Sequence, residues 1–247
     1  MISSQVKKFN MQKKVLIVIP CYNEEAALPL LLNELKQLIV PETYQLTPLV
    51  INDCSKDRTI EVAKKHGVKV LDLVNNLGIG GAVQSGFKYA NDNNFDIAIQ
   101  MDGDGQHPPS EIIKQLNTYE AEGADVVIGS RFIQNEGFQS SFMRRMGIKY
   151  FFNLNRLLTG NRIYDSTSGF RLLGRRAIEL AARNYPDDYP EPESLIIFSR
   201  AGLKIVETPV VMSHRLGGVS SIGNVSSIYY CIKVTISMLF SFIRKPK

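Results

Sequence analysis

Two carboxylates separated by one residue give the strongest chemical signal in this sequence. Asp102 and Asp104 follow the apolar run 97–101, and Gly103 stands between them. Glycine removes side-chain crowding, so both carboxylates can approach one divalent cation. Mg²⁺ and Mn²⁺ take few protein carboxylates and keep positions for water and substrate phosphates. We therefore predict a Mg²⁺ or Mn²⁺ site at Asp102 and Asp104, with Gln106 as a further oxygen ligand.

An ordinary polar turn is the alternative reading of these residues, because Asp and Gly dominate turns for local reasons. The surroundings favour the metal site. An apolar strand pattern precedes the two carboxylates, and the helix start Pro108-Pro109-Ser110-Glu111 follows them. Short turns between surface strands seldom have that setting.

The rest of the N-terminal half explains how the carboxylates would be positioned. Apolar runs alternate with helical patterns from Lys14 to Arg131. This alternation predicts an α/β fold with a mostly parallel, doubly wound sheet. Strands are expected at 14–20, 47–52, 68–73, 97–101 and 124–129. Asn23 is expected to cap the first helix, and later helices are expected at 58–66, up to Ala90 and at 110–120.

Ligands of such sheets lie beyond the carboxyl ends of the strands. Residues that follow a predicted strand should therefore share one edge and form a nucleotide site: Tyr22, Glu24, Asp53, Asp57, Asn76, Asp102, Asp104 and Arg131. Gly78-x-Gly80 has Val83 in place of the third glycine of a dinucleotide fingerprint, and the chain contains no GxxxxGK[ST] pattern. Rossmann dehydrogenases and P-loop enzymes are therefore disfavoured.

Composition limits the function classes. The 247 residues are 44% hydrophobic and 21% charged, which excludes a disordered or fibrous chain. A net charge of +5 fits an acidic substrate or an anionic membrane and does not require nucleic acid. Three dispersed cysteines predict a reducing, cytoplasmic setting without a disulfide framework. Residues 1–13 are expected to be a flexible lead-in rather than a signal peptide.

The C-terminal segment 222–247 is predicted to contain an amphipathic helix at 225–243. Nineteen residues span about 28 Å, nearly the thickness of a bilayer core. Lys233 near the middle disfavours a span and favours a helix lying in the membrane interface. Packing on the domain's own core or on a second subunit is the alternative. The apolar face is expected to hold Val225, Ile228, Tyr229, Ile232, Ile236, Leu239, Phe240 and Ile243.

With these residues in place, the chain resembles the family 2 glycosyltransferases, and within them the dolichol-phosphate mannose synthase and bacterial polyprenyl-phosphate glycosyltransferase branch. The resemblance extends from about Val15 to Ser221. Its motifs are Ile19-Pro20-Cys21-Tyr22-Asn23-Glu24, Asn52-Asp53-Cys54-Ser55-Lys56-Asp57, Asn76-Leu77-Gly78, Asp102-Gly103-Asp104-Gly105-Gln106-His107-Pro108, Gly129-Ser130-Arg131 and Ser168-Gly169-Phe170-Arg171.

The resemblance implies a glycosyltransferase A-type fold at 14–221 that binds a nucleotide-diphosphate sugar and inverts the anomeric carbon. It places the metal and diphosphate at Asp102, Asp104 and Gln106, and an acceptor phosphate at Arg131, Arg144 and Arg145. The nucleotide sugar would meet Pro20, Tyr22, Glu24, Asp53, Asn76, Asp102, Arg215 and Ser220, with Arg215 and Ser220 or Ser221 in a loop that closes over the donor.

The chemistry of glycosyl transfer is consistent with these assignments. Charge develops on the leaving diphosphate, so Asp104, through a bound cation, and Arg131 are candidate catalytic residues. A hydroxyl acceptor would need a base, for which Glu193 is the first candidate and Glu191 the second. A lipid phosphate is already ionised and needs none. His107 and His214 are interpreted as hydrogen-bonding structural groups.

Two departures from the family pattern matter. Asn52 stands where an acidic residue is usual, which leaves Asp53 as the carboxylate for the base; UDP is favoured over GDP-mannose as donor. The pair of transmembrane helices that many bacterial relatives carry is missing from this sequence. Membrane contact would then depend on the C-terminal helix, on a membrane partner protein or on a homo-oligomer.

We therefore expect a membrane-associated enzyme on the cytoplasmic face of the cell membrane. It would transfer sugar to a polyprenyl phosphate or lipid-linked saccharide in surface polysaccharide synthesis. A sugar nucleotidyltransferase is one alternative, but Cys21-Tyr22-Asn23-Glu24 stands where that class has a Gly-rich loop with Arg. A catalytically silent membrane scaffold of the same fold is the other.

Overall fold

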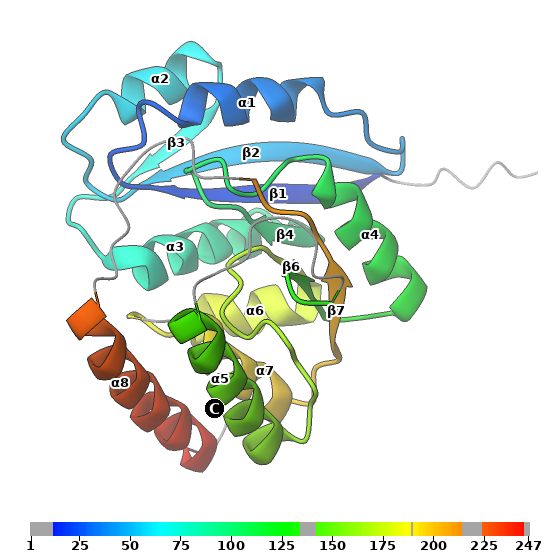
Figure 1. The fold of residues 1–247 in the computed structure, drawn as a ribbon. Helices are drawn as coiled ribbons and strands as arrows, with labels where there is room; N and C mark the ends of the chain where they lie inside the picture. Colours follow the sequence, from blue (N-terminus) through cyan, green and yellow to red (C-terminus); the bar gives the residue numbers. More distant parts are fainter. Residues whose placement is uncertain (1–11, 134–141, 189, 214–223, 245–247) are drawn as a thin grey trace, which may run out of the picture.

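The computed structural model describes residues 12–133, 142–188, 190–213 and 224–244, with the backbone alone for 142–145 and 224–230. A seven-stranded sheet forms its centre, in the order β3-β2-β1-β4-β6-β5-β7 (Figure 1). β6 is antiparallel to both neighbours, and every other pairing is parallel. The strands are β1 (Lys13–Cys21), β2 (Tyr44–Asn52), β3 (Lys69–Asp72), β4 (Ile97–Gln100), β5 (Val126–Ser130), β6 (Arg171–Gly174) and β7 (Ile205–Pro209).

The prediction of a mostly parallel α/β sheet is confirmed. Residues 15–21 of β1 are all buried, because this central strand is covered on both faces. The strand begins at Lys13, which pairs with Tyr44, so one residue expected in the lead-in belongs to the sheet.

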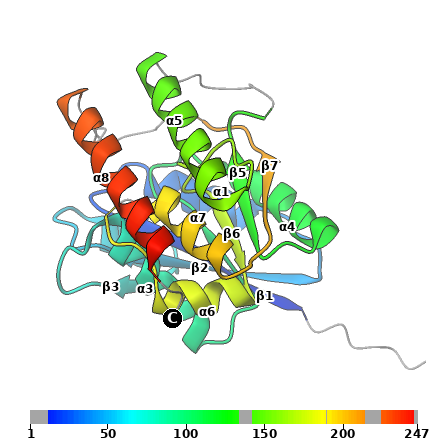
Figure 2. The same cartoon turned by 90° about the horizontal axis from the view of Figure 1, so that it is seen from below.

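Helices cover both faces of the sheet (Figures 1 and 2). Side chains of α1, α2 and α4 contribute to the hydrophobic core on one face, and those of α3, α6 and α7 to the core on the other. The helices are α1 (Leu28–Gln37), α2 (Thr59–Lys65), α3 (Gly78–Asp92), α4 (Glu111–Glu122), α5 (Phe142–Thr159), α6 (Arg175–Arg183), α7 (Pro190–Arg200) and α8 (Asn224–Ile243).

The first helix differs from its prediction. It begins at Leu28, with Ala27 as N-cap and no capping side-chain hydrogen bond, so Asn23 does not cap it. Asn23 instead adopts a left-handed backbone with φ of 57°, which asparagine tolerates better than most residues. Its side chain accepts a hydrogen bond from the Lys56 amide at 2.8 Å.

The strand order indicates where a ligand is expected to bind. The sheet reverses direction of winding between β1 and β4, because β2 and β3 lie on one side of β1 while later strands lie on the other. Antiparallel β6 begins at Arg171, which pairs with Gln100 of β4 and Ile128 of β5. The start of β6 therefore lies at the edge where β4 and β5 end.

Helices α5, α7 and α8 form a layer beside this body (Figure 2). Val234 and Met238 of α8 are buried against Phe151 of α5 and Ile196 of α7. The opposite side of α8 is exposed, with Phe240 at 70% and other members of the predicted apolar face also exposed: Ile232, Ile236, Leu239 and Ile243.

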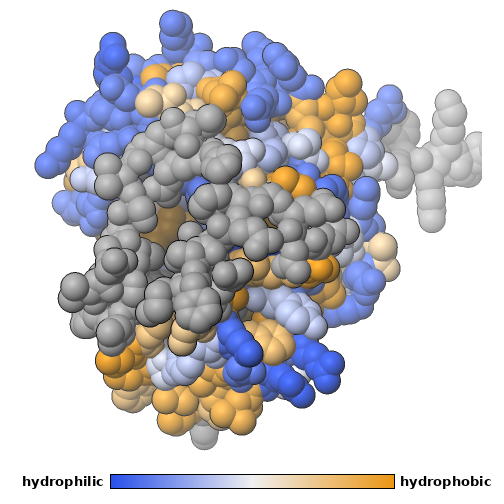
Figure 3. Space-filling view, in the orientation of Figure 1, coloured by the Kyte–Doolittle hydropathy of each residue, from blue (hydrophilic) through white to orange (hydrophobic). Residues whose placement is uncertain are grey.

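Hydrophobic residues gather at the lower end of the molecule, where α5 and α8 lie (Figure 3). Among the described residues, no helix has the length and hydropathy needed to cross a membrane. One face of α8 packs on the protein itself, which agrees with the alternative interpretation, and the predicted apolar face remains exposed.

Candidate functional site

The loops after β1 and β2 are fastened together by hydrogen bonds. The Asn23 amide donates to Ser55 Oγ at 3.0 Å, and the Glu24 amide donates to Thr59 Oγ1 at 2.9 Å. Asp57 accepts from the Glu25 amide at 2.9 Å, although the sequence indicated it only as an edge residue. These side chains hold the two loops in one conformation, which fixes the first half of the predicted nucleotide site.

Asp53 and Asn76 join the end of β2 to the start of α3. One oxygen of the buried Asp53 carboxylate accepts from the Leu77 amide at 2.6 Å. The Asn76 side chain donates to the Asp53 carbonyl at 3.1 Å. Tyr22 is half exposed above the neighbouring strand end, while Pro20 is buried within β1. Tyr22, Asp53 and Asn76 therefore follow three adjacent strands, as predicted.

Gly103 brings the loop after β4 against the end of β1. A Cβ on this residue would lie 2.6 Å from Cys21 Sγ and 3.1 Å from the Pro20 carbonyl oxygen. A larger residue would collide with the Cys21 side chain and press on the Pro20 carbonyl, so one of them would have to shift. Several carboxylates lie near this contact, as the pKa of the Cys21 thiol indicates. Burial raises this pKa, and the negative charges of Glu24, Asp102, Asp57 and Asp104 raise it further.

Asp102 and Asp104 have different surroundings. The Asp102 side chain is 36% exposed, whereas Asp104 is almost fully buried and accepts a hydrogen bond from the Gln106 amide at 3.0 Å. Asp104 therefore shapes its own loop, and Asp102 faces outward. Gln106 is partly exposed on the same loop.

His107 has a structural position, as interpreted from the sequence. Its ring stacks on Phe170, with centroids 4.9 Å apart, and Nδ1 accepts a hydrogen bond from the Asp102 amide at 3.1 Å. Burial lowers the pKa of His107 to about 4, so the ring is neutral at pH 7 and Nδ1 can accept. His107 thus orients the backbone of Asp102.

A divalent cation is compatible with these donors. Among the described residues, no three His, Cys, Asp or Glu side chains form a metal-binding group on their own. A partly exposed carboxylate at Asp102 instead suits Mg²⁺ or Mn²⁺ that takes further oxygen ligands from water and a diphosphate. The donor set fits a metal that is completed by substrate.

Arg131 is held by a buried carboxylate. Its Nε and Nη2 donate to Asp165 at 2.7 and 2.6 Å, and Nη2 also donates to Thr167 Oγ1 at 3.0 Å. Burial lowers the pKa of Arg131, but hydrogen bonding to Asp165 outweighs it and leaves the pKa above its ordinary value. The negative charges of Asp102 and Glu191 raise the pKa of Arg131 further. Arg131 therefore lies near Asp102, as predicted.

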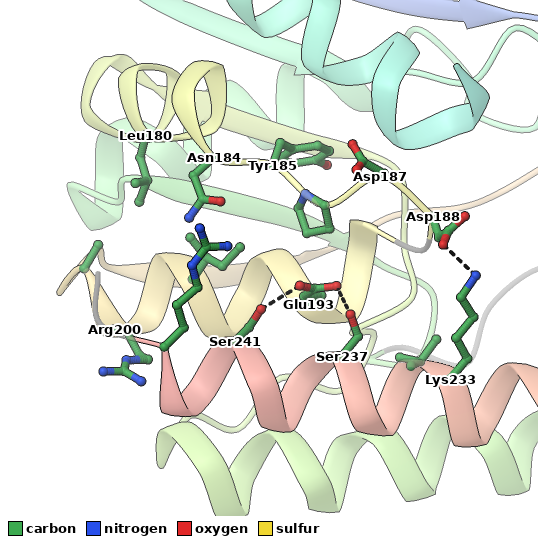
Figure 4. A pocket seen from close by; sticks show the side chains of 15 residues that line it. Leu180, Asn184, Tyr185, Asp187, Asp188, Glu193, Arg200, Lys233, Ser237 and Ser241 are labelled. Atoms are coloured by element: carbon green, nitrogen blue, oxygen red, sulfur yellow. Dashed lines mark hydrogen bonds and ion pairs between the residues drawn. The ribbon is translucent and has the colours of Figure 1, made fainter. Parts of the chain in front are cut away.

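Glu193 and Glu191 face different parts of the molecule. The Glu193 carboxylate accepts hydrogen bonds from Ser237 and from Ser241, the latter at 2.6 Å, so it holds α8 on α7 (Figure 4). It lines a cavity of about 380 Å³ between α6, α7 and α8, whose described lining does not include Asp102. The structure does not bring our first candidate base to the Asp102 edge, because Glu191 and Glu193 are two residues apart on α7 and therefore face opposite sides of the helix.

Glu191, the second candidate base, lies near the Asp102 edge. Burial raises its pKa, the buried Arg171 opposes that increase, and the charge of Asp102 adds to it. Arg171 is fully buried and donates to the Ser168 carbonyl at 2.7 Å and to Ser194 Oγ at 2.8 Å. The buried carboxylate of Glu191 on α7 and the buried guanidinium of Arg171 on β6 therefore lie near each other and near Asp102.

Some predicted residues lie outside the described part of the chain. Arg215, Ser220, Ser221 and His214 belong to 214–223, and Arg144 and Arg145 are described only as backbone of α5. Their predicted contacts with donor and acceptor stay predictions.

Sequence reasoning assigned no role to Gln100, Asp165, Arg171 or Tyr185. Each is buried, and a polar side chain beside an apolar strand pattern was the signal that could have identified Gln100 and Arg171. Asp165 had a signal too, because it precedes the Ser168-Gly169-Phe170-Arg171 motif.

Most of the chain matches a known protein family. The family model described as "Glycosyl transferase family 2" matches residues 16–180. An undecaprenyl-phosphate mannosyltransferase of Micrococcus luteus is 32% identical over 211 residues, covering 82% of this chain and 84% of that protein. A polyprenol monophosphomannose synthase of Mycolicibacterium smegmatis is 29% identical over 218 residues, covering 84% and 80%.

A similar fold is known from crystal structures. Glucosyl-3-phosphoglycerate synthase of Mycobacterium tuberculosis, in complex with Mn²⁺, UDP-glucose and phosphoglyceric acid, superposes with a TM-score of 0.71 at 16% identity. The match covers 95% of this chain and 81% of the other. At that identity the similarity shows the fold, which is the predicted glycosyltransferase A-type.

Proposed function

Because the chain belongs to glycosyl transferase family 2 and is a glycosyltransferase, we propose that it moves a sugar from a nucleotide-diphosphate sugar to a polyprenyl phosphate. The names of two relatives, an undecaprenyl-phosphate mannosyltransferase and a polyprenol monophosphomannose synthase, support this acceptor class. The observation that carries the proposal is the group of carboxylates at the carboxyl ends of β1 and β4, around Gly103 and with Arg131 nearby.

The donor would lie across the strand ends. Tyr22, Asp53 and Asn76 follow β1, β2 and β3 and would meet the nucleoside. Glu24 and Pro20 would also lie beside the nucleoside. The diphosphate would lie at the carboxyl ends of β1 and β4, where Asp102, Asp104 and Gln106 would hold Mg²⁺ or Mn²⁺. The bound cation would neutralise charge on the leaving diphosphate.

The transfer is a single displacement that inverts the anomeric carbon. An oxygen of the acceptor phosphate forms a bond to that carbon while the bond from carbon to the diphosphate oxygen breaks, and the nucleoside diphosphate leaves. Arg131 would orient the acceptor phosphate, with Arg144 and Arg145 supplying further positive charge. An ionised phosphate needs no proton acceptor, so no base is required and neither Glu191 nor Glu193 acts as one.

The exposed side of α8 would place the enzyme on the cytoplasmic face of the membrane. Its outward side chains include Ile236 and Phe240, and Tyr150 of α5 is also half exposed. Each large apolar side chain contributes roughly 1.5–3 kcal/mol when fully buried, so several half-buried ones support reversible attachment. Arg244 lies on the adjacent side of α8, in a groove that Ile236 and Phe240 also line, and would meet anionic headgroups there; Lys233 lines the same groove and is ion-paired with Asp188.

A transfer assay tests the proposal. The protein is incubated with undecaprenyl phosphate and UDP, GDP or dTDP sugars, each with Mn²⁺ or EDTA, and lipid products are analysed by mass spectrometry. We expect a glycosyl polyprenyl phosphate from one donor with Mn²⁺. The absence of a glycosylated lipid with all donors would overturn the proposal.

A further inference from the structure

The carboxylate of Glu207 holds a loop from the middle of the chain. Glu207 lies on β7, the strand next to β5 at one end of the sheet. Its Oε2 accepts a hydrogen bond from the Tyr164 amide and its Oε1 accepts one from the Asp165 amide, both at 2.8 Å. These two residues precede it by 43 and 42 positions. Glu207 therefore ties the loop before β6 to a strand of the sheet.

The loop between α5 and β6 has no regular structure to fix its backbone. Residues 160–170 belong to neither a helix nor a strand. Among the contacts described, the Tyr164 and Asp165 amides have Glu207 as their acceptor and no other. Asp165 is fully buried, and a buried amide without an acceptor costs free energy. The backbone position of Asp165 therefore depends on Glu207.

Two adjacent amides explain why this position has a carboxylate. A carboxylate offers an acceptor oxygen to each amide, whereas a glutamine side chain offers one oxygen and a competing N–H donor. The charge has an electrostatic cost. Burial raises the pKa of Glu207, the two amide hydrogen bonds oppose that increase, and the negative charge of Asp165 adds to it. A second carboxylate is thus kept beside Asp165 despite their repulsion, which indicates that the position of Asp165 matters.

Asp165 connects Glu207 to the ligand edge. Its carboxylate accepts from Nε and Nη2 of Arg131 at 2.7 and 2.6 Å, and from the Arg131 amide at 3.1 Å. Nη2 also donates to Thr167 Oγ1 at 3.0 Å. Among the contacts described, these leave Nη1 of Arg131 for a ligand. Asp165 therefore fixes where Nη1 lies, and Glu207 fixes where Asp165 lies.

We propose that Glu207 is a positioning residue for the acceptor phosphate and acts through Asp165 and Arg131. The inference rests on the proposed function, in which Arg131 orients that phosphate. Without one of its two amide contacts, the Asp165 backbone would shift and carry the Arg131 guanidinium with it. Nη1 would then be displaced from the phosphate. The nucleoside side of the edge is held by other hydrogen bonds, such as that from the Leu77 amide to Asp53, and should not respond.

Glu207→Gln tests the inference, because it keeps one acceptor oxygen and turns an N–H group toward the other backbone amide. Asp125→Asn is the matched control. Asp125 is also mostly buried and accepts from the Lys204 amide at 2.9 Å, but it precedes β5, at the end of the strand away from the ligand edge. Steady-state transfer measures KM for undecaprenyl phosphate, and calorimetry with Mn²⁺ measures Kd for the nucleoside diphosphate. Melting temperatures check that each variant is folded.

Glu207→Gln should raise KM for undecaprenyl phosphate about 10-fold and change Kd of the nucleoside diphosphate less than about 2-fold. Asp125→Asn should leave both within about 2-fold of wild type. An equal rise in KM and Kd would assign Glu207 a general structural role and overturn the inference, and so would an unchanged KM. If Glu207→Gln does not fold, Glu207→Asp, whose shorter side chain reaches one amide only, is judged by the same two measurements.

A double-mutant cycle tests the route through Arg131. Arg131→Lys keeps a positive charge beside Asp165 and removes Nη1 with the planar fork of donors. Adding Glu207→Gln to Arg131→Lys should therefore raise KM by less than about 2-fold more, and a further 10-fold rise would overturn the inference. Wild-type protein that transfers no sugar to undecaprenyl phosphate would overturn the proposed function. Wild-type transfer with an unchanged KM in Glu207→Gln would overturn the inference alone.

Discussion

The guanidinium of Arg131 meets the buried carboxylate of Asp165 through two parallel hydrogen bonds of 2.7 and 2.6 Å. Asp165 also accepts from the Arg131 amide at 3.1 Å. The carboxylate therefore fixes both the backbone and the side chain of the residue that would hold the acceptor phosphate. Since Nε and Nη2 are occupied, Nη1 is the part of Arg131 available to a ligand among the contacts described.

Arg131→Met should destabilise the protein by about 3 kcal/mol, because it leaves the buried Asp165 carboxylate without its cation. Chemical denaturation measures the free energy of unfolding. Arg176→Met is the matched control, since Arg176 is mostly exposed in its ion pair with Asp125 and should cost less than about 1 kcal/mol. Equal costs for the two variants would contradict a structural role for the Arg131–Asp165 pair.

Gly103→Ala should destabilise the protein by about 1–3 kcal/mol and abolish transfer, because its Cβ would collide with Cys21 Sγ at 2.6 Å. Adding Cys21→Ala removes that sulfur and should restore part of the lost stability. Denaturation of both single variants and the double variant measures the coupling energy. Strictly additive effects would show that the two residues do not collide.

Glu193→Ala should leave kcat within about 3-fold of wild type, because its carboxylate binds serines of α8; removal of a general base would cost about 10²–10⁴-fold. Hydrogen exchange in α8 should become faster in this variant. The double variant Ser237→Ala with Ser241→Ala should show the same increase. If kcat fell more than 100-fold in Glu193→Ala but not in the double serine variant, Glu193 would act in catalysis and this prediction would be wrong.

Replacing Ile236 and Phe240 by Asp should reduce binding to phosphatidylglycerol vesicles at least about 10-fold, because each charge must leave water when α8 enters the interface. Cosedimentation measures the bound fraction. The control replaces Ile39 and Val74, which are about 90% exposed elsewhere on the protein, and adds the same charge. Retained binding by the α8 variant, or an equal loss in the control, would contradict attachment through α8.

The strands and loops of the N-terminal half could be predicted from the sequence better than those of the C-terminal half. Local patterns located β1, β4 and the Asp102 loop, because buried parallel strands are continuous apolar runs and the residues after them share an edge. The place of β6 could not be predicted. Its insertion between β4 and β5 depends on long-range pairing, which brings Arg171 beside Gln100.

Helix α8 shows a second limit. Its sequence is apolar on more than one side, so periodicity selected the stripe containing Ile236 and Phe240, which is exposed. The buried side, with Val234 and Met238, was not identified. Likewise, Glu191 and Glu193 are two residues apart and equivalent by type, and the packing of α7 decides which one faces the site.

The central claim is that the Asp102 edge binds a nucleoside diphosphate together with a divalent cation. Calorimetric titration of UDP and GDP, each with Mn²⁺ and with EDTA, tests it in wild type, in Asp102→Asn and in the exposed control Asp92→Asn. The account predicts that one nucleotide binds with Mn²⁺, that EDTA and Asp102→Asn each weaken binding at least about 10-fold, and that Asp92→Asn changes nothing. Nucleotide affinity that is the same with EDTA as with Mn²⁺, and the same in Asp102→Asn as in wild type, would contradict it.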